Sequence, residues 1–347
     1  MSNAQLCVLF FMCLLCAGQG QVIDRVGEAE DGQFPHMALV EALYKFTPGF
    51  TNKRQPWRPI CGGTILGHYW VLTAEHCLMA HSFVDETTGG TVEASVDRLR
   101  VMVGSVNTND KNGRREVATW YYPGSFNKYY HDKNSDQTFL VDDILLLRLR
   151  CKLQLVRNKI WPAKLPRPNQ DLQADDRVIF AGWGVKNENF ETSNTLLYGH
   201  SDVVEQYYCR YFLNDRYSFN SLQKIQRMIR YLSRKTQRDE FLESSQICVG
   251  QREEGEREGS VPFSGDSGGG LFKGVDEEWI VYGVMSYSVD NDSPGVAGQV
   301  HGPAAFTRVS HYRPWIIETF VYDPYTNSTV IDPFFEEYYR QELEEEE

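Results

Sequence analysis

Residues 264–270 read SGDSGGG, so that Ser267 lies in a stretch that also contains four glycines. Glycine adopts backbone conformations that other residues avoid, and glycines around the serine therefore permit a tight turn. A serine hydroxyl is a weak nucleophile at neutral pH and reacts only where a neighbouring base takes its proton. If Ser267 is a nucleophile, the chain must also supply a histidine and an acidic residue to activate it.

Short runs of β-forming residues make up most of the remaining chain. Examples are RLRVMVGSV at 98–106, RVIFAGWG at 177–184 and WIVYGVMSYSV at 279–289, and clusters of Gly, Pro, Asn and Asp separate such runs. This pattern favours an all-β domain built as barrels or sandwiches. Two segments have the apolar spacing of a helix instead, namely SLQKIQRMIRYLSRK at 221–235 and VSHYRPWIIETF at 309–320.

Three further motifs accompany the serine stretch. They are CGGTILGHYWVLTAEHC at 61–77 with His76 beside Cys77, DDILLLRL at 142–149 with Asp143 before an apolar strand, and AGWG at 181–184. With SGDSGGG, and in the order His, Asp, Ser, they resemble the trypsin/chymotrypsin-like serine peptidases over about residues 23–320. The resemblance implies an all-β fold of two packed antiparallel six-stranded β-barrels with a C-terminal helix. It also implies an active site at the junction of the barrels.

The resemblance further implies a role for each residue of the set. His76 takes the proton of Ser267 and later passes it to the leaving amine, while Asp143 holds the imidazole in the productive tautomer. The backbone N–H groups of Gly265 and Ser267 form the oxyanion hole. Asp142 is adjacent to Asp143, but the family pattern D-I-x-L-L places the acid immediately before the isoleucine and selects Asp143. Without a catalytic role, Asp143 is a turn residue and His76 a core histidine.

The N-terminus indicates the compartment. Residues 6–17 read LCVLFFMCLLCA, an apolar run with the length of a secretory signal core and too short to span a bilayer. We therefore expect a signal peptide at 1–20, a peptidase domain at 21–320, and a secreted, extracellular protein with no membrane span. The alternative is a buried N-terminal helix. The N-x-S/T sequons at Asn291 and Asn327 predict glycosylation in this compartment.

Charge is unevenly distributed along the 347 residues. Thirty-five bases against 47 acids give a net charge of −12, which argues against nucleic acid as a partner. Residues 321–347 form an acidic tail that we expect to be mostly disordered. Residues 210–240 hold eight bases and three acids. This inserted segment is either a solvated amphipathic helix or a docking site for an acidic partner, which includes the protein's own tail.

Five cysteines remain after the leader, which is an odd number. In an oxidising compartment this number predicts two disulfides and one unpaired thiol. The family resemblance implies the pairs Cys61–Cys77 and Cys209–Cys248. It leaves Cys151 as a thiol that we expect to be buried rather than linked to another chain. The chain after the leader has no C-x-x-C or H-x-x-x-H spacing, so we expect no metal site and no cofactor.

The chain departs from the family pattern beside the histidine and at the N-terminus. Glu75 stands where the family has alanine; we expect it to be solvated, and the alternative is that it raises the pKa of His76. Family zymogens are cut after a basic residue, and the new amine pairs with the aspartate before the serine, here Asp266. The alignment places Ile23 at the new N-terminus, but Val22 precedes it. The cleavage signal is therefore weak.

The resemblance places the specificity pocket at Val261, Tyr287, Ser288 and Ala304. Trypsin-like members carry an aspartate at the position of Val261, and an apolar side chain there leaves the Lys or Arg of a substrate unpaired. Ser288 and Ala304 stand where deep pockets have glycine. We therefore expect a shallow pocket that prefers small or medium apolar side chains.

These observations predict a secreted serine endopeptidase that hydrolyses peptide bonds through an acyl-enzyme intermediate, without specificity for Lys or Arg. The alternative is a catalytically silent homologue that acts as an extracellular binding or regulatory protein. The intact set of His76, Asp143 and Ser267 favours the enzyme. We expect a monomer whose partners are protein or peptide substrates and serpin-type or other protease inhibitors.

Overall fold

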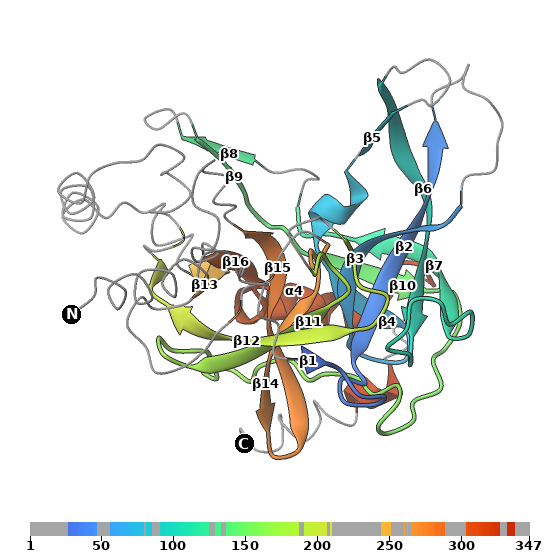
Figure 1. Cartoon of the computed structure of the whole chain (residues 1–347). Coiled ribbons are helices and arrows are strands. Elements are labelled where there is room, and N and C mark those ends of the chain that lie inside the picture. Colours follow the sequence, from blue (N-terminus) through green and yellow to red (C-terminus); the bar gives the residue numbers. More distant parts are fainter. Residues whose placement is uncertain are drawn as a thin grey trace, which may run out of the picture.

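The structure is a computed structural model, drawn in Figure 1. It describes residues 27–46, 56–79, 81–84, 91–124, 129–132, 137–186, 191–206, 209, 244–250, 260, 262, 265–288, 303–326 and 332–336. The expected signal peptide at 1–20, the basic insertion at 210–240 with its helical segment at 221–235, and the sequons at Asn291 and Asn327 lie outside the described residues.

The first half of the chain forms one closed barrel. Its strand order is β2-β3-β4-β10-β7-β6-β5, and a further pairing of β2 with β6 closes six of these strands into a ring. The pairs between neighbouring strands are antiparallel. The strands are β2 Met37–Phe46, β3 Arg58–Ile65, β4 Trp70–Thr73, β5 His81–Val84, β6 Thr91–Val103, β7 Arg114–Tyr121 and β10 Leu145–Leu149.

The second half forms another barrel of the same kind. The strand order is β1-β12-β11-β14-β15-β16-β13, and a pairing of β12 with β13 closes six strands. The strands are β1 Gly27–Glu28, β11 Arg177–Gly182, β12 Leu197–Val204, β13 Gln246–Gly250, β14 Gly270–Val275, β15 Glu278–Ser288 and β16 Ala304–Arg308. A separate ribbon pairs β8 Tyr129–Asp132 with β9 Gln137–Leu140. The prediction of two six-stranded antiparallel barrels is therefore confirmed.

Helix α4 Val309–Val321 follows β16 without a loop and confirms the helix predicted at 309–320. Its buried side chains recur at helical spacing at Val309, Tyr312, Ile316 and Phe320. These side chains belong to the apolar core cluster that holds the buried side chains of the first barrel together with some of the second. The helix therefore starts at the end of the second barrel and packs on the first. None of the described helices is long and apolar enough to span a membrane.

The prediction of a disordered tail at 321–347 is wrong for the part that the structure describes. Asp323, Asp332 and Phe335 are each 4 % exposed, and residues 333–336 are helical. The composition of the tail resembles that of a solvated segment, but two of its carboxylates have partners on the first barrel. Composition does not reveal such partners, because they lie far away in the sequence.

Candidate active site

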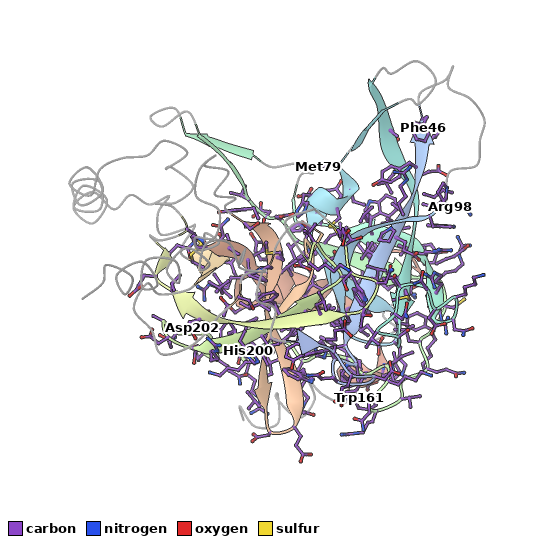
Figure 2. The ribbon with its side chains drawn as sticks, in the orientation of Figure 1. Phe46, Met79, Arg98, Trp161, His200 and Asp202 are labelled. Carbon is purple, nitrogen blue, oxygen red and sulfur yellow. A yellow bond between two sulfur atoms is a disulfide. The ribbon has the colours of Figure 1, made fainter. Side chains whose placement is uncertain are left out.

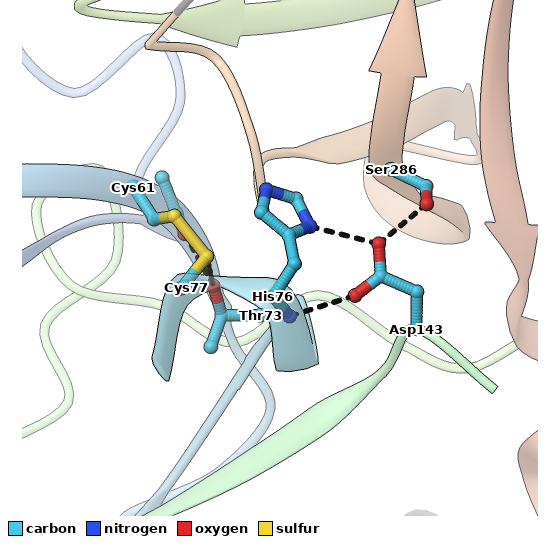
Figure 3. The surroundings of a disulfide bond; sticks show 7 residues. Cys61, Thr73, His76, Cys77, Asp143 and Ser286 are labelled. Atoms are coloured by element: carbon cyan, nitrogen blue, oxygen red, sulfur yellow. Dashed lines mark hydrogen bonds and ion pairs between the residues drawn. A yellow bond between two sulfur atoms is a disulfide. The ribbon is translucent and has the colours of Figure 1, made fainter. Parts of the chain in front are cut away.

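The disulfide Cys61–Cys77 fixes the segment that carries His76. Strand β4 is buried throughout and leads into a single 3-10 turn, η1 Glu75–Leu78. The disulfide joins this turn to β3, with 6.2 Å between the two Cα atoms. Figure 3 shows His76 beside this bond, with its Nδ1 edge turned toward Asp143. The sequence pairing for this disulfide is confirmed.

Strand pairing brings Asp143 to the same place. Asp143 is 1 % exposed and lies just before β10, which pairs with β4 in a register that sets Leu145 opposite Thr73. The preceding residue, Asp142, has a φ of 58°. Its carbonyl accepts a hydrogen bond from the Ile144 N–H, which makes a tight turn at the start of the strand. The turn and the register together place Asp143 next to the 3-10 turn that holds His76.

Three donors surround the Asp143 carboxylate. The His76 backbone N–H donates to Oδ1 at 2.9 Å, and the His76 Nδ1 donates to Oδ2 at 2.8 Å. The Ser286 hydroxyl also donates to Oδ2, as Figure 3 shows. Thr307 Oγ1 donates to the Asp143 carbonyl at 2.8 Å. These bonds fix the orientation of the buried carboxylate toward the histidine.

Sequence reasoning missed Ser286 and Thr307. Both residues come from the second barrel, on β15 and β16, whereas Asp143 belongs to the first barrel. Ser286 directly precedes the predicted pocket residue Tyr287, but nothing in that spacing indicates a contact with an aspartate 143 positions earlier. These two hydroxyls therefore join the barrels at the site.

Glu75 is buried, with an exposed fraction of 1 %. The expectation that Glu75 is solvated is therefore wrong, because the residue lies in the first turn of η1 where that turn packs into the core. Burial lowers the pKa of His76, but the charge and hydrogen bond of Asp143 and the charge of Glu75 outweigh it. The net effect raises the pKa of His76 above its ordinary value.

The turn that holds Ser267 packs against the strands that lead to His76. The Gly62 N–H donates to the Ser267 carbonyl at 2.8 Å. Gly268 has a φ of 73°, and a Cβ built there would lie 2.1 Å from Thr73 Oγ1 and 3.1 Å from the Ala74 nitrogen. Only glycine fits this approach. The Ser267 turn is thus in direct contact with Thr73 at the end of β4, three residues before His76.

The residues flanking Ser267 are also placed as a compact turn. Gly265 is exposed and has a φ of 90°. Asp266 is 2 % exposed, and its Oδ1 accepts a hydrogen bond of 3.0 Å from the Gly184 N–H. The AGWG motif at 181–184 therefore contacts the residue before the serine. Ile23, the predicted partner of Asp266, lies outside the described residues.

Three of the four predicted pocket residues lie together. In the antiparallel pairing of β15 with β16, Ser288 is opposite Ala304 and Tyr287 is opposite Ala305. Ala304 is fully buried, and the Tyr287 hydroxyl donates to Gln246 Oε1 at 3.3 Å. The fourth residue, Val261, lies outside the described residues.

Of the remaining cysteines, Cys209 and Cys248 are paired as predicted, whereas Cys151 differs from the prediction in its exposure. Cys209 and Cys248 form the second disulfide, with 5.8 Å between their Cα atoms. Cys151 is a free thiol as predicted, but it is exposed rather than buried, because the chain leaves the core at the end of β10. Among the described residues, the only group of three potential metal ligands is Cys61, His76 and Cys77. The two cysteine sulfur atoms are joined in the disulfide and are therefore not thiolate ligands.

The sequence is similar to those of known proteins. Residues 26–316 match the Trypsin family. The chain is 32 % identical to Melanization protease 1 of Drosophila melanogaster, over 84 % of this chain and 65 % of that protein. It is 28 % identical to Mast cell protease 2 of Meriones unguiculatus and 26 % identical to a chymase of Cavia porcellus. Each match covers 89 % of this chain and 94 % of the relative. The chain therefore belongs to the trypsin family of serine-type endopeptidases.

Proposed function

We propose that this chain is a secreted serine endopeptidase with His76, Asp143 and Ser267 as its catalytic triad. The observation that carries the proposal is the double contact of His76 with Asp143, through the backbone N–H and through Nδ1. A histidine that donates from Nδ1 to a carboxylate is in the tautomer whose Nε2 accepts a proton. The Ser267 turn lies against the end of β4. In the proposed mechanism the hydroxyl of Ser267 is the nucleophile, and His76 Nε2 takes its proton.

The reaction proceeds in two halves. Ser267 Oγ attacks the scissile carbonyl carbon while its proton passes to His76 Nε2, and a tetrahedral intermediate forms. The negative oxygen of this intermediate accepts hydrogen bonds from the N–H groups of Gly265 and Ser267. The carbon–nitrogen bond then breaks, and His76 gives its proton to the leaving amine. Water repeats the sequence on the acyl-enzyme, with His76 as base and then as acid, and releases Ser267.

Asp143 supports the charge that develops on His76 in each half. The carboxylate is buried and accepts bonds from three donors, so it does not reorganise when the imidazole becomes positively charged. Charge-assisted hydrogen bonds of this kind are stronger than neutral ones. The same carboxylate holds the ring orientation that aims Nε2 at the substrate side.

We expect small or medium apolar residues before the cleaved bond. Ser288 and Ala304 face each other across the β15–β16 pair, and with Tyr287 and Val261 they make the proposed shallow pocket. A pocket of this kind discriminates by about 1–3 kcal/mol for one methylene group. Cleavage of a peptide library by the active protein tests this specificity, and dominant cleavage after Lys or Arg would refute it.

Secretion and activation belong to the same proposal. The leader at 1–20 is removed, and further trimming leaves Ile23 as a new N-terminus whose amine pairs with Asp266. Asp266 is buried beside Gly184, and a buried carboxylate favours a positively charged partner. N-terminal sequencing of active material tests the pairing. Full activity in a chain that begins at Gln21 would contradict it.

The silent homologue is the second candidate, and the burial of Glu75 favours it. A buried carboxylate beside His76 stabilises the protonated imidazole, and a protonated His76 does not act as a base. A fluorophosphonate probe that labels nucleophilic serines distinguishes the two candidates. Labelling of the mature protein that is lost in Ser267→Ala supports the peptidase, whereas no labelling after any processing supports the silent homologue.

A further inference from the structure

The chain continues past the region that matches the family. The family match ends at residue 316, and the described residues continue to 326 and resume at 332–336. We call residues 321–326 and 332–336 the C-terminal clasp. Two acidic residues of the clasp, Asp323 and Asp332, are each 4 % exposed as whole residues. Burial of a carboxylate is costly unless it is paired and hydrogen-bonded, so the partners of these two groups identify what the clasp binds.

Asp332 is bound by the turn between β3 and β4. Its Oδ2 accepts hydrogen bonds from the backbone N–H groups of His68 at 2.7 Å and Tyr69 at 3.3 Å. Its Oδ1 accepts from His68 Nδ1 at 2.7 Å and from the Phe334 N–H at 3.1 Å. Four donors fill the acceptor capacity of one carboxylate. A Cβ built on Gly67 would lie 2.9 Å from Asp332 Oδ2, so the glycine in this turn leaves room for the carboxylate.

Asp323 is bound by the end of β10. Arg148 Nε donates to Asp323 Oδ2 at 2.9 Å, and the two side chains are 9 % and 6 % exposed. The Tyr325 N–H donates to the other carboxylate oxygen at 3.0 Å. The Arg148 guanidinium also lies over the rings of Tyr69, at 4.1 Å from the centroid, and Tyr325, at 5.9 Å. The ion pair is therefore enclosed between a ring of the barrel and a ring of the clasp.

Aromatic rings of the clasp pack against rings of the rest of the protein. Phe335 of the clasp meets Phe320 of α4 edge to face at 5.0 Å, and Phe320 stacks on Trp70 of β4 at 5.0 Å. Phe334 meets Trp161 edge to face at 5.8 Å. Figure 2 shows Trp161 at the end of the molecule opposite Met79, the residue that follows η1. The clasp therefore binds the end of the first barrel that is remote from His76.

The two strands that the clasp binds are those that carry the catalytic pair. β4 and β10 pair with each other, with Arg148 opposite Trp70 at the clasp end and Leu145 opposite Thr73 at the site end. β4 continues into His76 at the site end, and Asp143 lies just before β10 there. Backbone bonds at the clasp end, such as that from the Leu149 N–H to the Tyr69 carbonyl, join the same two strands.

We propose that the C-terminal clasp holds β4 and β10 in position and thereby sets the contact between His76 and Asp143. In this proposal Asp323 and Asp332 are positioning residues, and they act through the two strands without touching a substrate. The proposal rests on the proposed peptidase function. A paired β-strand transmits a displacement at one end to the other because its backbone hydrogen bonds and buried side chains are close-packed.

The test compares three variants of the full chain. Asp332→Asn and Asp323→Asn remove one carboxylate charge each from the clasp, and Glu336→Gln removes the same charge from an exposed position of the same segment. Hydrogen exchange with mass spectrometry reports on β4 and β10 relative to β14 and β15 of the second barrel. Fluorophosphonate labelling of Ser267 as a function of pH, well below the unfolding temperature, reports on the site.

The expected result is selective. Both clasp variants exchange faster in β4 and β10 and not in β14 and β15, and their labelling rates fall by about ten- to a hundredfold, as misplacement of about 1 Å can cause. Because Asp143 raises the pKa of His76, a weaker contact moves the acid limb of the labelling profile to lower pH. A purely structural role does not move this limb. Glu336→Gln behaves as the unaltered chain does.

Two results would overturn the proposed role of the clasp. The first is hydrogen exchange in β4 and β10 that is unchanged in the Asp323→Asn and Asp332→Asn variants. The second is a general loss of protection in both barrels while the acid limb of the labelling profile stays where it was. A chain that carries no substitution and is not labelled at any pH refutes the proposed peptidase instead, and the exchange measurement then still decides whether the clasp holds these strands.

Discussion

His36 gives the protein a measurable sensitivity to acid. Its side chain is fully buried, and neither ring nitrogen has a hydrogen-bond partner among the described residues. The ring lies 4.2 Å from that of Phe272, 5.4 Å from that of Trp279 and 6.1 Å from that of Phe34, between centroids. Burial in this apolar cluster lowers the pKa of His36 from 6.5 to about 3. The folded protein therefore keeps His36 neutral where the unfolded chain takes up a proton.

The size of the effect follows from the two pKa values. Above the unfolded pKa of 6.5, neither state binds the proton and His36 adds no pH dependence. As the pH falls from there toward the folded value, the unfolded state binds more protons, and folding loses about 1.4 kcal/mol for each pH unit. At about pH 4.5 the loss from this one residue is about 2.7 kcal/mol. Such a loss is a large fraction of the stability of a typical domain.

The substitution His36→Phe removes the titrating group and keeps a flat ring in the cluster. Replacement of unpaired polar atoms by apolar ones of similar shape is nearly neutral or stabilising, so we expect the variant to be at least as stable at neutral pH. At about pH 4.5 its advantage over the unsubstituted chain grows by about 2.7 kcal/mol. Urea unfolding of both proteins with intact disulfides measures this difference, in a Ser267→Ala background that prevents self-cleavage.

The comparison isolates His36, because other groups titrate equally in both proteins. A difference in unfolding free energy that grows below pH 6.5 and levels off near the folded pKa of about 3 supports the reasoning. The reasoning fails if the two proteins lose stability in parallel from neutral pH to about pH 4.5. That result would mean that water or a polar group reaches the ring in the folded state.

Three further predictions concern the site and the clasp. Ser267→Ala abolishes probe labelling and lowers the rate of peptide hydrolysis by roughly a millionfold. Steady-state kinetics measure this loss, and an unchanged thermal unfolding transition shows that the variant is folded. Glu75→Gln removes a charge that raises the pKa of His76, so the acid limb of kcat/KM moves to lower pH; an unmoved limb contradicts the coupling. Asp323→Ala leaves Arg148 buried without its ion pair and destabilises the protein by about 3–5 kcal/mol in denaturant unfolding. Addition of Arg148→Met restores most of this stability if the unpaired charge is the cause.

The sequence predicts the barrels and the motif segments because their signals are local. The run at 144–149 becomes the buried strand β10 and the buried residue Ile144 before it. The glycine-rich residues 265–270 form a turn with positive φ at Gly265 and Gly268. The pairing of Cys61 with Cys77 also follows the family spacing. Each of these features depends on residues within one segment or on a spacing that the family repeats.

The errors have a common physical origin. The burial of Asp332 depends on backbone N–H groups 263 and 264 positions earlier, and the acidic composition of the tail does not contain that information. The exposure of Cys151 and the burial of Glu75 depend on how the chain enters or leaves the core at one residue. General tendencies of cysteine and glutamate do not determine this. Long-range packing decides these three positions.

Glu75 determines how the two candidate functions must be compared. A silent homologue and a peptidase with a raised His76 pKa share the same geometry, because Glu75 acts on the protonation of His76 and leaves its bonds to Asp143 in place. Both are inactive where His76 is protonated, and only the peptidase gains activity as the pH rises through that pKa. An assay at a single neutral pH therefore confuses them. Labelling of Ser267 that is weak where His76 is protonated and rises with pH identifies a peptidase. If the Glu75→Gln variant reaches the same maximal rate at lower pH, Glu75 tunes the base of that peptidase. No labelling across the whole range, in a folded chain with a trimmed N-terminus, identifies the silent homologue.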